Sequence, residues 1–270
     1  MEKEKLKKVK IYGERNSGTH FITRLIRRNF ICETIPGTLA DAEKPGYRDK
    51  FEEQLESLIL DDCKRKLASS IKVDEYFLGN PWKTLGWKHC VPPMDTIASH
   101  PENKKILFIT LTKNPYAWAL SMFRRPYGNF CLKKPDDLGQ FLKEPWVTAN
   151  RDNCHSILNS PIELWNLKTD GYKQLAKNYT VLRVRYEDAI DSPEDFLSMI
   201  STYLEKKPKK FTILHKSAKQ EDVGKKDLNY YRDYYLNQRW REQLTAEHIK
   251  SINQYLDPSI VEEAGYKMID

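Results

Sequence analysis

Residues 13–20, GERNSGTH, combine glycine, hydroxyl and basic side chains in a pattern that suits phosphate binding. Glycine lets the backbone curl so that successive N–H groups converge on phosphate oxygens, and the start of a helix adds positive potential. The G-x-x-x-x-G-K-[ST] pattern of kinases and ATPases has the same two glycines, but here Thr19 replaces its lysine and His20 its magnesium-binding hydroxyl. Those enzymes need both groups to hold a triphosphate. We therefore expect an anionic nucleotide without a magnesium-bound triphosphate; an ordinary strand-to-helix turn is the alternative.

A lysine followed by a histidine forms a second group with catalytic potential. His89 can accept a proton from a hydroxyl at neutral pH, since an unperturbed imidazole has a pKa of about 6.5. Lys88 can balance negative charge on a group in transfer. A single histidine is more often structural than catalytic, so this prediction depends on its neighbours in the fold.

A basic residue and a hydroxyl lie eight positions apart, at Lys113 and Ser121. Both can reach one phosphate if the chain turns sharply between them, and Pro115 favours such a turn because it fits the first turn of a helix. Lys113 offers a point charge and not the two-pronged geometry of arginine. We predict a second phosphate contact here; the alternative is that Ser121 is an ordinary helix residue.

The elements that position these residues follow from the hydrophobic pattern. Apolar, β-branched runs predict four strands: Lys8–Gly13, Leu85–His89, Lys105–Thr112 and Tyr179–Val184. Helical spacing and capping residues predict helices after residue 18, over Phe51–Leu67, from Pro115, over Pro161–Ala176, from Pro193 to about Leu204, and from Thr245 to about Leu256. Alternating strands and helices indicate an α/β fold with a mostly parallel sheet. Ligands bind at the carboxyl ends of such strands, so we expect residues 13–20, 88–89 and 113–114 to share one site.

Composition narrows the function classes. The 270 residues carry a net charge of +7, which attracts anions such as nucleotides, acidic sugars, nucleic acid or lipids. Five scattered cysteines without a C-x-x-C pair argue against a disulfide framework or a zinc site and favour reduced thiols. No apolar run approaches the roughly 18 residues of a membrane span, and the charged N-terminus is not a signal peptide. We expect one domain over residues 1–270, located in the cytoplasm.

In chain order these segments resemble the sulfotransferase superfamily. Asn16-Ser17-Gly18-Thr19 takes the place of the family's 5′-phosphosulfate loop, where S-G-T follows a basic residue; here Asn16 stands at the basic position and Arg15 precedes it. Lys113-Asn114-Pro115 with Ser121 resembles the 3′-phosphate segment. Residues 86–89, GWKH, resemble the segment with the catalytic histidine, and residues 183–188, RVRYED, resemble a core segment beside the cofactor, in which Arg185 and Glu187 are expected to pair.

The resemblance implies a P-loop-like three-layer fold and sulfuryl transfer from the nucleotide PAPS, which leaves PAP as product. The implied cofactor contacts are Arg15, Asn16, Ser17, Gly18, Thr19, His20, Lys113 and Ser121. His89 would deprotonate the acceptor, while Arg15 or Lys88 would stabilise charge, and no metal is required. We expect a carbohydrate or other small-molecule acceptor and no nucleic-acid partner; residues 37–83 and 125–160, which match no family motif, would shape the acceptor pocket. The alternatives are a P-loop nucleotide kinase and a non-enzymatic nucleotide-binding module.

Overall fold

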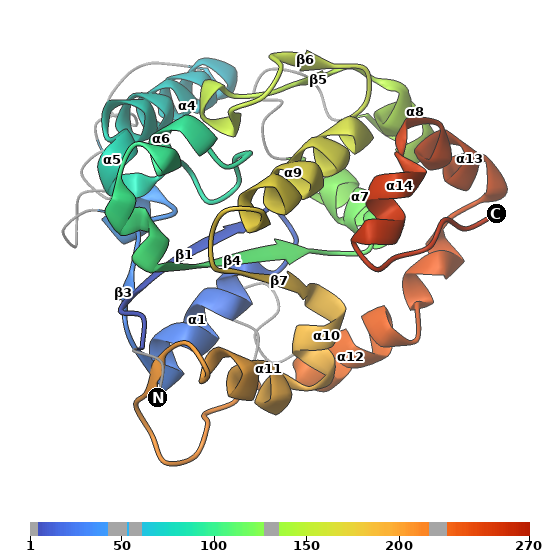
Figure 1. Cartoon of the computed structure of the whole chain (residues 1–270). Helices are drawn as coiled ribbons and strands as arrows, with labels where there is room; N and C mark the ends of the chain where they lie inside the picture. Colours follow the sequence, from blue (N-terminus) through green and yellow to red (C-terminus); the bar gives the residue numbers. More distant parts are fainter. Residues whose placement is uncertain (1–4, 43–52, 54–60, 127–134, 216–225) are drawn as a thin grey trace.

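A parallel four-stranded sheet forms the centre of the computed structural model, which describes residues 5–42, 53, 61–126, 135–215 and 226–270. The strand order is β3-β1-β4-β7 (Figure 1), with β3 at Glu33–Thr34, β1 at Lys8–Gly13, β4 at Ile106–Thr112 and β7 at Val181–Arg185. β1 and β4 pair in parallel from Lys8 opposite Ile106 to Gly13 opposite Leu111. The predicted α/β class with a parallel central sheet flanked by helices is confirmed.

Helices cover both faces of the sheet, which explains why β4 is apolar almost throughout. Leu107, Ile109 and Leu111 pack on one face, where they meet α1 (Thr19–Asn29), α10 (Tyr186–Asp191), α11 (Pro193–Ile200) and α12 (Leu228–Leu236). Ile106 and Phe108 point to the other face, where α4 (Asp62–Gly79), α5 (Pro81–Thr84), α6 (Met94–Ala98) and α9 (Pro161–Ala176) lie. A strand buried on both sides needs this continuous apolar sequence.

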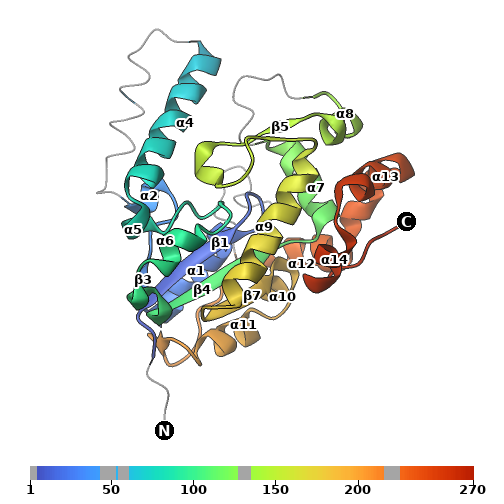
Figure 2. The same ribbon diagram turned by 45° about the horizontal axis from the view of Figure 1, so that its top comes forward.

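A second group of helices lies beyond the carboxyl ends of the strands. It comprises α7 (Pro115–Arg124), α8 (Leu138–Lys143), α13 (Ala246–Tyr255) and α14 (Pro258–Glu263), with the 3₁₀ turn η4 (Arg239–Gln243). The remaining helical elements of the described residues are short: α2 (Leu39–Ala42), η1 (Pro101–Lys105) and η2 (Asn150–Asp152). Two short antiparallel pairs lie outside the main sheet, β2 (Phe30–Ile31) with β8 (Glu205–Lys206) and β5 (Trp146–Val147) with β6 (Ile157–Leu158). Figure 2 shows α4 rising away from the β3 side of the sheet.

The predicted strand at Leu85–His89 is wrong. Leu85 and Gly86 both have positive φ, 51° and 82°, so the backbone cannot be extended there. The cause lies on β1, where the buried ammonium of Lys10 donates to the carbonyls of Thr84 (2.5 Å), Gly86 (2.6 Å) and Pro36 (2.8 Å). Satisfying one buried cation with three carbonyls folds this segment into turns.

Other boundaries differ by smaller amounts. The helix predicted over Phe51–Leu67 is described from Asp62, with Asp61 as its N-cap, and it continues to Gly79; apart from residue 53, the predicted part before residue 61 lies outside the described residues. The helix from Pro193 ends at Ile200 and not near Leu204. The helix from Pro115 and the helix over Pro161–Ala176 are confirmed.

The prediction that all cysteines are reduced thiols is wrong. Cys32, Cys90 and Cys154 are free, but Cys63 is disulfide-bonded. Disulfides are rare in reducing compartments, so this bond counts against the cytoplasmic location, which stays a prediction.

Among the helices that the structure describes, none combines the length and the apolar character that crossing a membrane requires.

Candidate functional site

The turn of residues 14–18, which the sequence predicts to bind phosphate and which we call the phosphate turn, leaves the end of β1 and enters α1. Two of its residues have positive φ, Asn16 at 63° and Gly18 at 92°. A Cβ on Gly18 would lie 2.3 Å from a ring carbon of Tyr186, so only glycine fits at that position. Ser17 donates both its N–H (3.1 Å) and its hydroxyl (2.5 Å) to the Glu14 carbonyl. Ser17 therefore shapes the turn.

The turn presents unused backbone donors to the cleft above it. No described residue accepts a hydrogen bond from the backbone N–H groups of Gly18, Thr19 and His20, which begin helix α1. The positive end of a helix and open backbone donors are features that favour anion binding. The side chain of Asn16, which stands at the family's basic position, points away toward α7 and donates to Met122 Sδ (3.3 Å) and to the Arg125 carbonyl (3.3 Å).

Lys113, directly after β4, lies against this turn. Its ammonium is buried and donates to the Asn16 carbonyl (3.2 Å), the Ser121 hydroxyl (2.9 Å) and the Tyr235 hydroxyl (2.7 Å). All three acceptors are neutral, and Lys113 forms no ion pair with a described carboxylate. Burial consequently lowers the pKa of Lys113 from an ordinary 10.5 to about 7. An uncompensated buried cation is costly, and an incoming anion would relieve that cost.

Lys88 and His89 lie on the other side of the turn, although they follow no strand. The backbone of Lys88 accepts from Gly13 N–H (2.9 Å) and donates to the Gly37 carbonyl (3.1 Å), which fixes this segment beside the end of β1. The Lys88 side chain is buried and has no described carboxylate as ion-pair partner, and burial lowers its pKa. Lys88 is therefore a second cation that an anion could stabilise.

The ring of His89 is held in one orientation. Its Nδ1 lies 2.5 Å from the Gly13 carbonyl, and its plane is nearly perpendicular to that of the Trp87 ring, with 4.8 Å between the ring centres. A carbonyl can only accept, so in the neutral ring Nδ1 carries the proton and Nε2 keeps its lone pair. Burial, together with Lys88 and Arg15, holds the pKa of His89 well below 6.5, so the expectation of an unperturbed pKa is wrong.

One cleft of about 470 Å³ joins these segments at the carboxyl ends of β1 and β4. Its lining includes the predicted site residues Arg15, Asn16, Gly18, Thr19, His20, Lys88, His89 and Lys113. Tyr186, Tyr231 and Tyr235 line one wall, and no Asp or Glu is present among its described lining residues. Ser17 and Ser121 do not line it, so within the described site they support the turn and Lys113 from behind. The predicted convergence of the first turn and Lys113 is confirmed.

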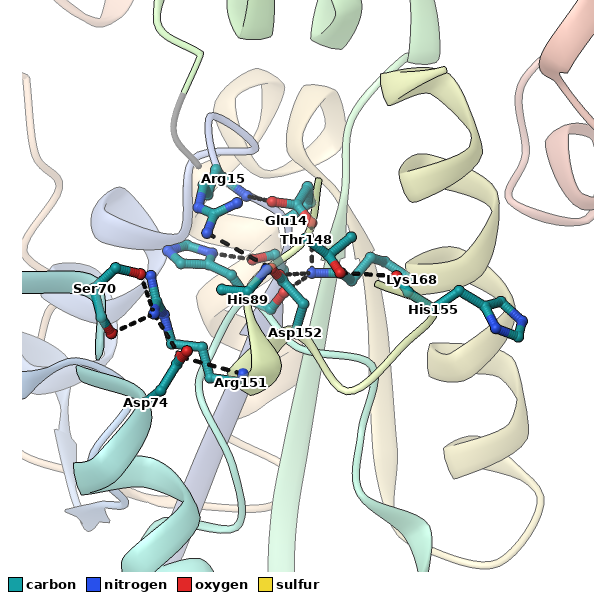
Figure 3. A network of polar contacts seen from close by, with 12 residues as sticks. Glu14, Arg15, Ser70, Asp74, His89, Thr148, Arg151, Asp152, His155 and Lys168 are labelled. Atoms are coloured by element: carbon teal, nitrogen blue, oxygen red, sulfur yellow. Dashed lines mark hydrogen bonds and ion pairs between the residues drawn. The ribbon is translucent and has the colours of Figure 1, made fainter. Parts of the chain in front are cut away.

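Arg15 differs from Lys88 in being held by its surroundings. Its guanidinium stacks on Trp87 at 4.4 Å from the ring centre, and one of its nitrogens lies 3.9 Å from a carboxylate oxygen of Asp152 (Figure 3). Arg151 stacks on the same tryptophan at 4.6 Å and forms an ion pair with Asp74 of α4 at 2.6 Å. Arg15 thus lines the cleft but already has an anionic neighbour.

Three features of the site were not predicted from the sequence. The first is Tyr235 of α12, whose hydroxyl accepts a hydrogen bond from Lys113 and whose ring packs against Tyr186. The only signal for it in the sequence is the run of tyrosines around it. The buried group formed by Glu14, Asp152 and Lys168 belongs to no motif. In the RVRYED segment, Arg185 pairs with Asp188 at 2.6 Å and not with Glu187, which corrects the prediction. Glu187 instead accepts from the backbone N–H of Asn114 (3.0 Å), next to Lys113.

Comparison with known proteins gives only distant structural similarity. No protein-family model matches the chain, and no curated protein matches it. Mouse sulfotransferase SULT7A1 complexed with PAP has 13% sequence identity and a TM-score of 0.45 over 92% of this chain and 82% of its own. The sulfotransferase domain of the Synechococcus PCC 7002 olefin synthase has 13% identity and 0.41 over 95% and 98%. Retinol dehydratase in complex with androsterone and inactive cofactor PAP has 14% identity and 0.41 over 98% and 80%. At these values the likeness assigns neither an activity nor a ligand to this chain.

Proposed function

We propose that this chain is a sulfotransferase that moves a sulfuryl group from PAPS to a hydroxyl or amine of an acceptor. One observation carries the proposal: two buried ammonium groups without ion-pair partners among the described residues, Lys113 and Lys88, flank a turn with open backbone N–H groups in one cleft. PAPS carries phosphates at both ends of its ribose, and the 5′ phosphate bears the sulfuryl group to be transferred. The two cationic ends of the cleft match that distribution of charge.

The residues of the chain divide between the two ends. Lys113 would bind the 3′-phosphate, with Ser121 and Tyr235 holding its ammonium in place. The N–H groups of Gly18, Thr19 and His20 would bind the 5′ end. Lys88 is the better candidate than Arg15 for stabilising charge there, because Arg15 is already near Asp152 while Lys88 has no described carboxylate partner.

His89 would act as the general base. Its Nδ1–H donates to the Gly13 carbonyl, so Nε2 is the atom that receives the acceptor's proton. The lowered pKa keeps the ring neutral at pH 7 and therefore ready to accept. Lys88 and the backbone N–H groups would then stabilise the negative charge that develops at the 5′ end, which is catalysis by positioning and preorganised charge.

Residues 37–83 and 125–160 would shape the acceptor site. Of their described parts, Thr38 lines the cleft, and the Arg151–Asp74 ion pair connects α4 to Trp87, on which Arg151 stacks. We expect a carbohydrate or other small molecule as the acceptor.

A thermal-shift experiment tests the proposal against its rivals. PAP should raise the melting temperature in a concentration-dependent way, because a ligand that binds only the folded state stabilises it by mass action. ATP with magnesium should have a smaller effect at equal concentration. Stabilisation by ATP with magnesium and none by PAP would favour a nucleotide kinase. Binding of PAP without transfer of radiolabelled sulfate to any acceptor in a carbohydrate and phenol panel would favour a non-enzymatic nucleotide-binding module.

A further inference from the structure

The side chain of Lys168, from the middle of α9, ends among the side chains of Glu14 and Asp152 (Figure 3). It is 1% exposed, and its ammonium lies 2.8 Å from a carboxylate oxygen of Glu14 and 2.6 Å from one of Asp152. It also donates to the backbone carbonyl of His89. Lys168 does not line the cleft, so it cannot contact a ligand there directly.

Each partner of Lys168 belongs to a different segment of the site. Glu14 opens the phosphate turn, and its other oxygen accepts from the backbone N–H of Arg15 at 2.6 Å. The His89 carbonyl belongs to the segment with the proposed base. Asp152, in η2, accepts from the Ala149 N–H (2.8 Å), and its backbone carbonyl accepts from Val91 N–H (2.9 Å), two residues after His89. One ammonium therefore joins three segments that are far apart in sequence.

Among the described residues, the charges of this group balance. Two carboxylates, Glu14 and Asp152, face the cations Lys168 and Arg15. Burial alone would lower the pKa of Lys168, but Asp152 and Glu14 outweigh it and raise the pKa, so the ammonium persists at neutral pH. Burial likewise opposes ionisation of Asp152, but Lys168 and Arg15 hold its pKa below the ordinary value. Lys168 forms both a hydrogen bond and an ion pair with Asp152, whereas its contact with Glu14 is an ion pair only. Removing one member of such a buried group leaves an unpaired buried charge.

We propose that Lys168 is a positioning residue that holds the phosphate turn, through Glu14, and the His89 ring, through the His89 carbonyl, in fixed mutual geometry. The inference rests on the proposed function for its kinetic consequences, but its structural content concerns the ligand-free protein. Lys168 holds the backbone carbonyl of His89, and the Gly13 carbonyl holds Nδ1 of its ring. These two contacts fix the ring so that Nε2 keeps its lone pair for the proton of the acceptor. A misplacement of about 1 Å at a reacting group can reduce turnover about 100-fold.

The test is the ¹⁵N NMR spectrum of the histidine rings in the ligand-free protein, with the His89 signals assigned by comparison with His89→Gln. The wild-type protein should show neutral His89 with the proton on Nδ1. Charged groups that face His89 are Lys88, Arg15 and Lys168, with Glu14 and Asp152 beyond Lys168. Lys168→Met removes the anchor and a repelling cation, so the single Nδ1–H form should be lost and the pKa of His89 should move up toward its ordinary value.

One further variant, Glu14→Gln, separates the contact of Lys168 with the phosphate turn from its contact with the His89 carbonyl. Glu14→Gln cuts the tie to the phosphate turn and leaves the His89 carbonyl on Lys168; PAP affinity should fall about tenfold, the effect of about 1.4 kcal/mol, while the His89 spectrum stays unchanged. Lys168→Met should change both the PAP affinity and the His89 spectrum, and its kcat should fall about 10- to 100-fold. Lys173→Met is the matched control: this half-buried lysine on the same helix pairs with Glu263, away from the cleft, and its replacement should change neither the PAP affinity nor the His89 spectrum.

The outcomes are distinct. A folded Lys168→Met protein with the wild-type His89 spectrum and an unchanged kcat would show that Lys168 only stabilises the fold and would overturn the inference. Should Lys168→Met fail to fold, Lys168→Arg, which keeps the charge with a different geometry, is measured in its place and must alter the His89 spectrum. Failure of the wild-type protein to bind PAP would reject the proposed function, yet the NMR comparison would still decide the role of Lys168.

Discussion

The ammonium of Lys113 lies 2.7 Å from the hydroxyl of Tyr235, across 122 positions of sequence. Burial raises the pKa of Tyr235 to about 12 and lowers that of Lys113 to about 7, so at neutral pH the hydroxyl is uncharged and cannot neutralise the ammonium. The Tyr235 ring adds a cation–π contact at 4.2 Å. This pair keeps a cation oriented toward the cleft without cancelling its charge.

Replacing Lys113 by methionine should weaken PAP binding without unfolding the protein. Hydrogen bonds to a charged group contribute about 1.5–3 kcal/mol, so the dissociation constant measured by calorimetry should rise about 10- to 150-fold. Stability should be maintained because an apolar chain of similar length replaces a buried charge. Lys173→Met, on a half-buried lysine of α9 that does not line the cleft, serves as the control. Equal affinity in Lys113→Met and wild type would show that no phosphate contacts this lysine.

PAP affinity should fall as the pH rises through 7. In the free protein the pKa of Lys113 is about 7, and a bound phosphate favours the ammonium and so raises that pKa. Binding therefore takes up a proton, and above pH 7 the affinity should drop by up to about tenfold per pH unit. Calorimetry in buffers of different ionisation enthalpy between pH 7 and 9 measures this uptake. Lys113→Met should show a weaker dependence, because Lys88, whose pKa burial also lowers, remains in the cleft. A wild-type affinity independent of pH across this window would refute the argument.

His89→Ala should abolish most turnover while PAP still binds. Loss of a general base typically reduces kcat about 100- to 10,000-fold, measured with radiolabelled PAPS and any acceptor found in the panel. Because the pKa of His89 is held well below 6.5, protonation should inactivate the wild-type enzyme only well below pH 6.5. His155→Ala, on a histidine that does not line the cleft, is the control. Turnover by His89→Ala at the wild-type rate would remove its catalytic role.

Gly18→Ala should destabilise the protein strongly. The positive φ of Gly18 and the 2.3 Å approach to Tyr186 leave no room for a methyl group, so the free energy of unfolding should fall by at least about 2 kcal/mol. Gly79, at the end of α4, has no positive φ and no neighbouring atom within 4 Å of the place a Cβ would occupy, so Gly79→Ala should be neutral or stabilising by up to about 1 kcal/mol. Chemical denaturation measures both; a similar small effect in the two variants would contradict the geometry.

The sequence predicted those parts of the site that depend on local pattern. Lys8–Gly13 as a strand, the turn after it and the helix from Pro115 follow from apolar runs and from proline and glycine placement. The turns at residues 85–89 could not be predicted in this way because Lys10, some 75 positions earlier, determines them. Glu14, Asp152 and Lys168 are ordinary charged residues in the sequence, and only the fold brings them together in a buried group.

The position of α12 near the end of the chain determines when the cleft is completed during synthesis. A nascent chain that has emerged as far as α11 already has β1, β4 and β7 and the turn at residues 14–18, but it lacks Leu228, Tyr231 and Tyr235. Because chains emerge from the N-terminus, the wall built by α12 is added last. Until then Lys113 faces water on that side, and the cleft gains its full depth only when this late segment docks.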